Sequence, residues 1–414
     1  MGIGDIILYG TLFTSLFFEV FLLINFFEIR EEVRLEKALI LSEVASYPTV
    51  TIIVPCFNEE RTILSTLNSL LGLDYPKDKL SIIVVDDGST DSTQQVLSNY
   101  NTHSQIRIFS KENGGKYTAL NFALTKIESE FVGCLDADSF VDSLALKKII
   151  PKFNDEKVMA VTPSIHVFEP KTVLQRVQRI EYNWGILFRR VLASINGLYV
   201  TPGPFSIFRT QMLKEIGGYR HAHQTEDMEL ALRMHRNGLK ISISQEAHIF
   251  TIAPAQLKGL YKQRVRWTYG FLKNAIDYKD MYFNKKYGTL GLFVLPLATL
   301  SIFTTIFATG NLIKTTFTKG VEFFVKYQAV GFSWGVPKFT FNFYSLDTSV
   351  TWILTLTVVS LTLVLIYISL YIANGKARFS RDIIYYLLLY VLIVPLWVIR
   401  ASFNALFSRK VTWR

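Results

Sequence analysis

Residues 49–60 read TVTIIVPCFNEE, a largely apolar and β-branched run that closes on polar side chains. A run of this kind is typical of a strand that is buried on both faces of a parallel sheet. Pro55 and Asn58 mark the end of that strand, and residues 60–71 have the apolar spacing of a helix. The stretch therefore predicts the first strand–helix unit of an α/β domain.

The same alternation continues to residue 135. Strands are predicted at 81–85, 106–109 and 131–135, and helices at 92–99 and 116–125. Strand and helix in alternation indicate a parallel sheet with helices on its faces. We therefore expect an α/β domain. It extends over residues 30–282, the part of the chain that holds most of the Asp and Glu residues.

Long apolar stretches lie on either side of this domain. The stretch at 6–27 carries a single charge, Glu19, and those at 287–313 and 348–375 carry none. A membrane-spanning helix needs about 20 predominantly apolar residues, so all three stretches qualify. Glu19 predicts either a side chain that lines a wet interior or one that reaches an interface.

A fourth stretch, 383–399, is shorter and contains Pro395. It fits a crossing helix and a re-entrant or interfacial segment equally well. The chain thus divides into an N-terminal transmembrane helix at 1–29, the α/β domain at 30–282 and a C-terminal transmembrane region at 283–414.

Composition excludes several other classes of protein. Half of the 414 residues are hydrophobic and 19% are charged, which excludes a disordered chain. The mean hydropathy of +0.27 is unusual for a soluble enzyme, and two cysteines, Cys56 and Cys134, exclude a disulfide scaffold. The net charge of +10 suits anionic lipid and a polyanionic substrate. No nucleic-acid motif accompanies that charge, so no nucleic-acid partner is expected.

Basic residues predict the orientation in the membrane. They follow the first span at Arg30, Arg34 and Lys37 and the third span at Lys376, Arg378 and Arg381. Such clusters are typical of the cytoplasmic side. We therefore expect a cytoplasmic α/β domain in a multi-pass protein of the cell membrane, with an outer loop at 312–347. The basic tail at Arg409, Lys410 and Arg414 conflicts with this if 383–399 crosses fully.

Polar and acidic side chains follow three of the predicted strands. They are Asn58 and Glu59, Asp86 and Asp87, and Asp136 and Asp138. Ligands of open α/β sheets bind beyond the carboxyl ends of the strands, so we expect these side chains to share one edge. The alternative interpretation is that each acidic turn caps the helix after it.

The pair at Asp136 and Asp138 suggests how a phosphorylated ligand is held. The sequence has neither a G-x-G-x-x-G after the first strand nor a Walker A motif. Mg²⁺ and Mn²⁺ prefer oxygen ligands, and Mg²⁺ commonly takes one or two carboxylates together with substrate phosphates. DAD directly after a buried strand therefore predicts a divalent-metal site.

Six short motifs follow one another along the chain. They are VPCFNEE (54–60), DDGSTD (86–91), NGGK (113–116), DADS (136–139), TED (225–227) and QRVRW (263–267). With the flanking spans, they resemble the processive family-2 glycosyltransferases, which include cellulose, chitin, hyaluronan and poly-N-acetylglucosamine synthases. The chain length, the single leading span and the tail VTW are most similar to the poly-β-1,6-N-acetylglucosamine synthases.

The resemblance implies a fold and a set of residue roles. The fold is a GT-A domain that rests on amphipathic interfacial helices above transmembrane helices, and 173–192 and 256–273 have the composition of such interfacial helices. The substrate-binding residues would be Pro55, Asn58, Glu59, Asp86, Asp87, Lys116, Asp136, Gln263, Arg264, Arg266 and Trp267.

Within that set, Asp86 and Asp87 would hold the uracil ring of a UDP-sugar. Gln263, Arg264 and Arg266 would lie over the diphosphate, and Trp267 would line the acceptor end. The catalytic residues would be Asp227, as general base, and its neighbour Glu226. Asp138, with Asp136, would bind Mg²⁺ or Mn²⁺.

The resemblance implies a processive inverting transferase that polymerises a sugar from a UDP-sugar, foremost UDP-N-acetylglucosamine, and exports the polysaccharide. Its partners would be the donor, the growing polysaccharide and membrane lipid, and the sequence does not decide whether a small membrane accessory subunit takes part. Synthases that use UDP-glucose or UDP-glucuronate remain alternatives, as does transfer of one sugar to a lipid. A third alternative is a transporter or receptor with a nucleotide-sensing domain, which would not need the Asp227 base.

Overall fold

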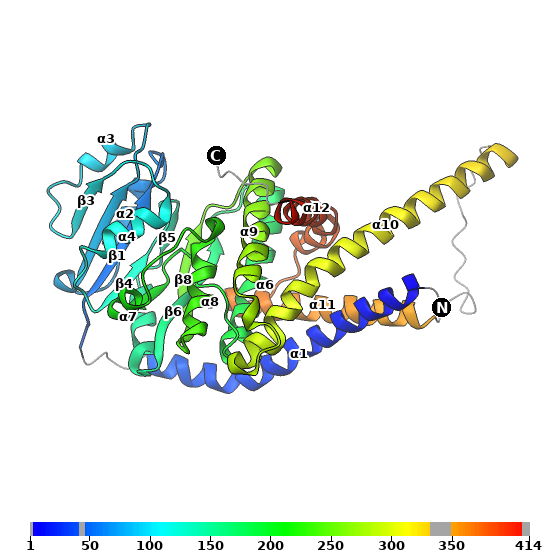
Figure 1. Ribbon diagram of the computed structural model, residues 1–414, viewed down its shortest axis with the longest axis horizontal. Helices are drawn as coiled ribbons and strands as arrows, with labels where there is room; N and C mark the ends of the chain where they lie inside the picture. The colour runs from blue at the N-terminus through cyan, green and yellow to red at the C-terminus, as the bar shows by residue number, and fades with distance from the viewer. Residues whose placement is uncertain (1–2, 41–45, 332–348, 408–414) are drawn as a thin grey trace.

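A computed structural model describes residues 3–40, 46–331 and 349–407 of the chain. The α/β domain lies at one end, and long helices extend from it along the longest axis of the molecule (Figure 1). Two further helices stand between the domain and these long helices. The three layers correspond to the predicted domain, interfacial helices and membrane region.

One eight-stranded mixed sheet forms the centre of the domain, in the order β3-β2-β1-β4-β7-β6-β8-β5. The strands are β1 (Val50–Cys56), β2 (Leu80–Asp86), β3 (Ile106–Ser110), β4 (Phe131–Cys134), β5 (Ser139–Val141), β6 (Val158–Val167), β7 (Ile207–Arg209) and β8 (Lys240–Thr251). The first four are parallel, as the sequence predicted, and β1 lies between β2 and β4.

The other half of the sheet, for which the sequence analysis made no prediction of strands, is mixed. Strand β7 runs antiparallel to both β4 and β6, and β5 runs antiparallel to β8, whereas β6 and β8 are parallel. Strands β5 and β7 have three residues each, too few to show a hydrophobic period. Their direction depends on the tertiary pairing and carries no local signal.

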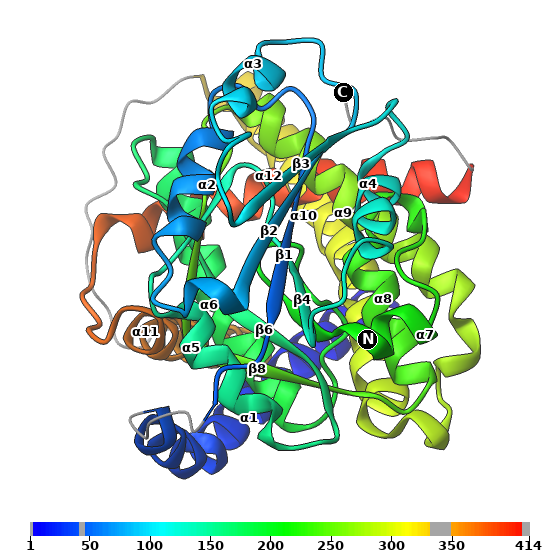
Figure 2. The same ribbon diagram turned by 90° about the vertical axis from the view of Figure 1, so that its left-hand side faces the viewer.

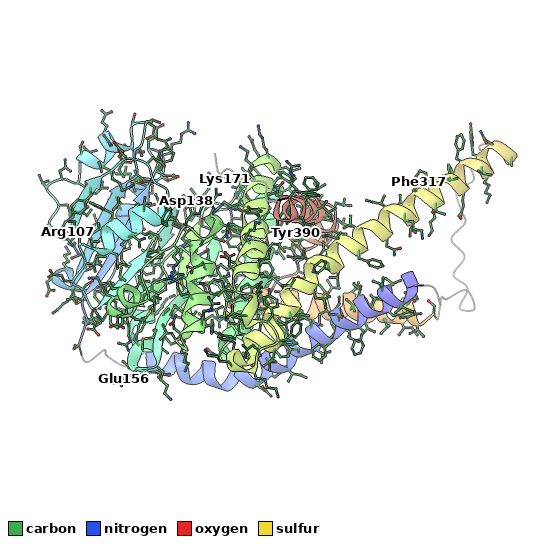
Figure 3. All side chains as sticks on the ribbon, in the orientation of Figure 1. Arg107, Asp138, Glu156, Lys171, Phe317 and Tyr390 are labelled. Carbon is green, nitrogen blue, oxygen red and sulfur yellow. The ribbon has the colours of Figure 1, made fainter. Side chains whose placement is uncertain are left out.

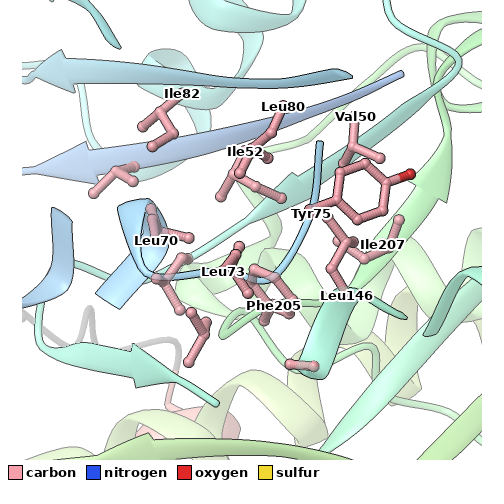
Figure 4. Packing of buried hydrophobic residues seen from close by; sticks show 14 of the residues in the cluster. Val50, Ile52, Leu70, Leu73, Tyr75, Leu80, Ile82, Leu146, Phe205 and Ile207 are labelled. Atoms are coloured by element: carbon pink, nitrogen blue, oxygen red, sulfur yellow. The ribbon is translucent and has the colours of Figure 1, made fainter. Parts of the chain in front are cut away.

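Alternate side chains of the parallel strands fill two separate cores. Ile52 of β1 packs into one cluster and Ile53 into the other, in line with the alternation of side chains along a strand. Figure 4 shows the first cluster, in which Ile52 and Ile82 lie beside Leu70 of the covering helix. Fully burying an isoleucine or leucine side chain stabilises a fold by about 1.5–3 kcal/mol. This apolar run therefore fixes both faces of the sheet at once.

Short helices cover the two faces. They are α2 (Ile63–Leu71), α3 (Thr93–Ser98), α4 (Lys116–Leu124), α5 (Ala145–Ile149), α7 (Thr210–Glu215) and α8 (Glu226–Arg236). Single 3₁₀ turns lie at Lys77–Lys79, Ile150–Asn154, Ala222–Gln224, Lys279–Met281 and Lys285–Tyr287. The predicted helices at 60–71, 92–99 and 116–125 are confirmed within a few residues.

The two predicted interfacial helices are also present, as α6 (Val173–Ser194) and α9 (Leu257–Asp277). A capping box starts α6, because the Thr172 hydroxyl accepts from the Gln175 N–H and the Gln175 side chain accepts from the Thr172 N–H. Helix α6 packs against β6 and β8 on one side. On its other side it packs against the long helices, so it forms the floor of the domain.

Within the described part of the chain, four helices are long and apolar enough to cross a membrane. They are α1 (Ile3–Ile40), α10 (Leu295–Val330) with the π-helical turn Leu290–Val294 before it, α11 (Val350–Asn374) and α12 (Arg381–Leu406). The first part of the predicted outer loop at 312–347 is helical, because α10 continues to Val330; its position outside the membrane stays a prediction. Residues 314–330 lack proline, and apolar side chains such as Phe317, Val321 and Phe324 keep helical spacing there.

Glu19 lies at the contact between α1 and α11. Its side chain is 7% exposed, and its Oε1 accepts a hydrogen bond of 2.5 Å from the Thr362 hydroxyl. A second polar contact, from the Thr351 hydroxyl to the Tyr9 hydroxyl at 2.9 Å, joins the same two helices nearer their outer ends. Glu19 is therefore an interhelical residue, and of its two predicted positions the structure favours the protein interior.

Helix α12 runs across the direction of the other long helices. Figure 1 shows α12 end-on while α10 and α11 lie across the page, and Figure 2 shows α12 from the side while α11 is end-on. It packs against α9 and α6, the two interfacial helices. This arrangement favours the interfacial alternative for 383–399. The tail residues Arg409, Lys410 and Arg414 lie outside the described residues.

The orientation of α12 can be tested by labelling single cysteines in membrane vesicles. We expect Ser380→Cys and Phe407→Cys, at either end of α12, to react with an impermeant maleimide from the same side. Val350→Cys, at the far end of α11, should react from the opposite side. The native Cys56 and Cys134 are free and buried, so they give a low background. If Phe407→Cys reacts from the same side as Val350→Cys, α12 crosses the membrane.

Candidate active site

The carboxyl ends of β1, β2 and β4 lie side by side, because these strands pair in parallel in the order β2-β1-β4. The side chains that follow them therefore lie along one edge of the sheet, as the sequence predicted. Asp138 lies near enough to Asp136 and Glu59 for both charges to alter its pKa. In the view of Figure 3, Asp138 lies between the sheet and helix α9.

Asp86 and Asp87 are both buried and hydrogen-bonded within the chain. Asp86 accepts from the Ser89 N–H at 3.0 Å and from the Gln94 side chain at 2.7 Å. Asp87 holds the NGG turn before α4 through the N–H groups of Gly114 and Gly115, at 3.1 and 2.8 Å, and through the Lys111 ammonium at 2.6 Å. Asp87 thus binds the turn before α4 and does not cap α3, the helix that follows it in the chain, so the helix-capping interpretation does not hold for Asp87. A contact of either residue with a uracil ring stays a prediction.

Lys116, the first residue of α4, joins the two acidic motifs. Its ammonium lies 2.6 Å from Asp136 Oδ1 and 3.1 Å from Glu226 Oε1. Burial lowers the pKa of Lys116, but the charges of Asp136 and Glu226 outweigh burial and raise it well above the usual value. Lys116 is therefore a permanent cation between the end of β4 and the start of α8.

The two carboxylates that begin α8 differ in proton affinity. Burial raises the pKa of Glu226, yet Lys116 and the backbone amides bring it below the usual value. Burial and the charge of Glu226 raise the pKa of Asp227 to about 6. Near neutral pH, Asp227 is thus an ionised carboxylate that binds a proton far more strongly than a free aspartate, which suits a general base.

A small cavity lies beside these groups. It encloses about 10 Å³ and is lined by Lys116, Cys134, Gly203, Tyr219, Glu226 and Asp227 among others. Space of this size holds about one water molecule. Asp227 is also tied to the cavity wall, because its carbonyl oxygen accepts from the N–H and the hydroxyl of Thr201.

The wall formed by residues 201–206, TPGPFS, was not predicted as part of the site. A Cβ atom at Gly203 would lie 2.7 Å from the Lys116 ammonium and 3.2 Å from Asp136 Oδ2. Only a glycine therefore lets this loop approach the Lys116–Asp136 pair closely. The available signal was the sequence Pro-Gly-Pro between two predicted elements, which marks a rigid turn.

The chemistry of Asp136 and Asp138 fits a divalent cation. Burial, followed by the charges of Asp136 and Glu59, raises the pKa of Asp138 to about 6. The described residues include no group of three or more His, Cys, Asp or Glu side chains arranged for a metal. Two carboxylates that repel each other in a buried place are a sufficient protein contribution for Mg²⁺, which takes its other ligands from phosphate and water.

An open hollow of about 360 Å³ lies next to the end of β1. Its walls are Asn58, Glu59, Glu60, Arg61, Thr62 and Asp91. Asn58 has a left-handed backbone, with φ of 56°, and its side-chain oxygen accepts from the Thr90 N–H at 2.8 Å. Pro55, by contrast, lies within β1 opposite Val85 and lines neither the hollow nor the cavity.

The QRVRW motif lies on α9, and its members face different ways. Arg266 donates to the Gln224 carbonyl oxygen at 3.0 Å, and its charge lowers the pKa of both Glu226 and Asp227. Arg264 instead turns to α6, where it pairs with Glu181 at 2.8 Å and lies 4.2 Å from the centre of the Trp267 ring. Gln263 is half-buried.

The loop before α8 has an unusual backbone. Ala222, His223 and Gln224 all have positive φ values, of 37°, 51° and 68°. Non-glycine residues in this region each store roughly 1–3 kcal/mol of strain, which neighbouring contacts must hold. Contacts from α9 hold it here, through the Arg266 bond to Gln224 and an ion pair of 2.9 Å between His223 and Asp277.

The structure thus brings Lys116, Asp136, Glu226, Asp227 and Arg266 together. Asp86 and Asp87 form a separate, internally bonded group one strand away. Arg264 lies on the α6 side of its helix.

Several curated proteins similar to this chain are named poly-beta-1,6-N-acetyl-D-glucosamine synthase. Poly-beta-1,6-N-acetyl-D-glucosamine synthase of Staphylococcus epidermidis is 27% identical over 332 residues, which cover 77% of this chain and 79% of the relative. The synthase of the same name from Staphylococcus aureus is 30% identical over 249 residues, 59% of this chain and 60% of the relative.

Among solved structures, mannosyltransferase PcManGT of Pyrobaculum calidifontis, in complex with GDP-Man and Mn²⁺, covers 98% of this chain and 100% of its own. The TM-score is 0.62 at 20% sequence identity. This likeness confirms the GT-A fold. Residues 48–270, more than half of the chain, match the model of the family "Glycosyltransferase like family 2". The chain therefore belongs to the family-2-like glycosyltransferases.

Proposed function

We propose that this chain transfers N-acetylglucosamine from UDP-N-acetylglucosamine to the growing end of a polysaccharide, processively and with inversion at the sugar carbon. The observation that carries this proposal is the Lys116 bridge, which joins the proposed metal-binding motif to the motif that holds Asp227. The printed name of the curated relatives supports the choice of sugar. The four apolar helices support a membrane location.

The donor would lie across the edge formed by β1, β2 and β4. The hollow beside Asn58 and Glu59 would receive part of the nucleotide, next to the loop of Asp86 and Asp87. Lys116 and Arg266 supply positive charge near the proposed diphosphate position. Asp136 and Asp138 would hold Mg²⁺ or Mn²⁺, which would neutralise charge on the departing diphosphate.

The transfer needs one base and no covalent intermediate. The acceptor hydroxyl would give its proton to the Asp227 carboxylate as its oxygen bonds to the sugar carbon C1. The bond between C1 and the diphosphate oxygen breaks on the opposite face, and UDP leaves with that electron pair. Glu226 stays ionised because Lys116 binds it, so its charge keeps the pKa of Asp227 raised.

Trp267 would close the acceptor end. An aromatic ring covers the apolar face of a sugar and leaves its polar N–H free. Arg264 lies against the Trp267 ring and fixes it toward α6. A growing chain held on these interfacial helices is already close to the long apolar helices, which supports export across the cell membrane from a cytoplasmic domain.

The base assignment predicts a large effect of Asp227→Asn. The amide keeps the shape of the side chain but cannot accept a proton, so we expect kcat to fall by about 10²–10⁴-fold while UDP-N-acetylglucosamine still binds. The matched control is Asp280→Asn, which changes an exposed carboxylate paired with Arg236 and should leave the rate near that of the wild type. An Asp227→Asn enzyme with half the normal rate would assign the base to another group.

The raised pKa of Asp227 sets the direction of the pH dependence. Asp227 must be ionised to work, and it becomes protonated as the pH falls through about 6. We therefore expect kcat/KM to be level above that pH and to fall about tenfold per pH unit below it. A profile that stays level down to pH 4.5 would exclude this assignment.

The metal assignment predicts that Asp138→Asn removes the effect of Mg²⁺ or Mn²⁺ on UDP binding. Calorimetry with UDP, with and without each ion, would measure this effect. Asp142→Asn serves as the control, because Asp142 is also close to β5 but pairs with Lys148 away from the site. Transfer activity that persists in excess EDTA would refute a role for the cation.

The proposed reaction is tested by giving the purified chain each of UDP-N-acetylglucosamine, UDP-glucose and UDP-glucuronate with Mg²⁺. We expect a long polymer from the first donor only, and linkage-specific glycosidases then identify its bonds. A single sugar on a lipid would show the non-processive alternative. In vesicles with the domain outside, polymer protected from added glycosidase would show that the chain also exports its product.

A further inference from the structure

Helix α6 carries an arginine with an unused hydrogen-bonding edge. The Nε and Nη2 atoms of Arg189 are buried, and neither has a hydrogen-bond partner in the described part of the chain. Burial lowers the pKa of Arg189 to about 10, so it remains a cation at neutral pH. Folded proteins pair nearly all buried polar groups, because an unpaired one costs about 1–3 kcal/mol. The two unpaired N–H groups of Arg189 therefore indicate a binding position for a ligand.

The two unpaired atoms form one functional unit. In the planar guanidinium, the Nε–H and one Nη2–H lie on the same edge and point in the same direction. This fork binds two oxygen atoms at once. The unpaired edge of Arg189 thus offers two parallel N–H donors, which suit two neighbouring oxygen atoms on a single ligand.

Residue 185, one turn before Arg189 on α6, is a glycine, so no side chain at that position covers the guanidinium on its Nη1 side. Apart from the backbone of α6 itself, a Cβ at Gly185 would have the Arg189 guanidinium as its nearest described neighbour, with Nη1 at 3.6 Å. Tyr182, Gly185 and Arg189 are spaced three and four residues apart, so they share one face of α6. We call these three residues the open face of α6.

The open face begins next to the candidate active site. Burial raises the pKa of Tyr182, with Arg264 and Asp138 among the charges that act on it. Tyr182 also hydrogen-bonds Arg264, which lies against the Trp267 ring. The near end of the open face is therefore close both to the metal-binding motif and to the proposed acceptor end.

The open face then leads away from the site between α6 and α9. At its far end, Arg189 is a neighbour of Tyr199, whose ring packs edge-on against Phe271 of α9 at 6.1 Å. Tyr182 and Arg189 are seven residues apart, which is about 10 Å along a helix. The same spacing separates their partners Arg264 and Phe271 on α9. The two helices thus flank a route that leads from Trp267 to Arg189.

We propose that Arg189 is a binding residue for the acceptor glycan, and that its Nε–Nη2 edge binds the acetamido carbonyl oxygen and a neighbouring hydroxyl oxygen of an N-acetylated sugar already added to the chain. The proposal rests on the proposed function. Arg189 would then hydrogen-bond a sugar that lies farther from the active site than the sugar in contact with the Trp267 ring. It also gives the enzyme a means to prefer an N-acetylated acceptor.

The test compares two neutral acceptors with the full-length protein in detergent. They are an N-acetylglucosamine pentamer and the glucose pentamer of the same linkage, which lacks the carbonyl group. We expect the wild type to have the lower KM for the N-acetylated pentamer. Arg189→Met should raise that KM about tenfold and abolish the preference, while the Kd for UDP stays unchanged. Arg189→Lys keeps the charge but not the fork, so it should lose the preference as well.

Thermal unfolding separates a binding role from a structural one. Replacing a buried, unpaired charge by an apolar side chain of similar size is neutral or stabilising, so Arg189→Met should not lower the Tm. Arg190→Met is the matched control, because Arg190 contacts Gln245 of β8. That variant should lower the Tm yet keep the preference between the two pentamers.

Each outcome bears on one claim. An Arg189→Met protein that keeps the wild-type preference, or that only loses thermal stability, would overturn the assignment of Arg189. If the wild type elongates only a lipid phosphate or a uronate acceptor, the ligand of the Arg189 edge is an anion and the assignment of the acetamido group is wrong. A wild type that elongates neither pentamer with UDP-N-acetylglucosamine would show that the proposed function itself is wrong.

Discussion

The Lys116 ammonium is the contact on which the rest of the site depends. It lies between Asp136, which follows β4 of the parallel half of the sheet, and Glu226, which begins α8. Two neighbouring carboxylates repel each other, so the cation between them makes their approach favourable. Burial and the charge of Glu226 raise the proton affinity of Asp227, and the Lys116–Asp136 pair requires a glycine at position 203. A single charge therefore couples the fold of both halves to the chemistry of the edge between them.

The interfacial helices extend this coupling toward the membrane. Helix α9 reaches the loop before α8 through Arg266 and reaches α6 through Arg264. Helix α6 packs on the sheet and on the long helices, so a displacement of the long helices shifts α6 against the sheet, and a displacement of the sheet shifts it against the long helices. The strained backbone at Ala222, His223 and Gln224 is kept in place by α9, which ties the position of Asp227 to the helices beneath it.

The sequence predicted those parts of the molecule whose cause is local. The run at 49–54, the polar residues after three strands and the order of six motifs were enough for the parallel half of the sheet, the long helices and the family. The direction of β7, the approach of Gly203 to Lys116 and the turn of Arg264 toward α6 could not be predicted, because each is decided by contacts between segments far apart in the chain. The continuation of α10 to Val330 was not predicted, because Lys314, Lys319 and Glu322 end the apolar run while the helical spacing of the apolar residues continues past them.

The helical segment that contains α10 is longer than a bilayer is thick. It runs from Leu290 to Ala329, has 40 residues, and includes a stretch apolar enough to cross a membrane. At 1.5 Å per residue, it measures about 60 Å, roughly twice the hydrocarbon thickness of a bilayer. Membrane helices tilt by about 40° at most, and such a tilt cannot bring this length inside the hydrocarbon. A bilayer that α10 crosses therefore cannot cover its whole length, and the thickness of that bilayer decides how much of the Phe317 and Phe324 surface meets water.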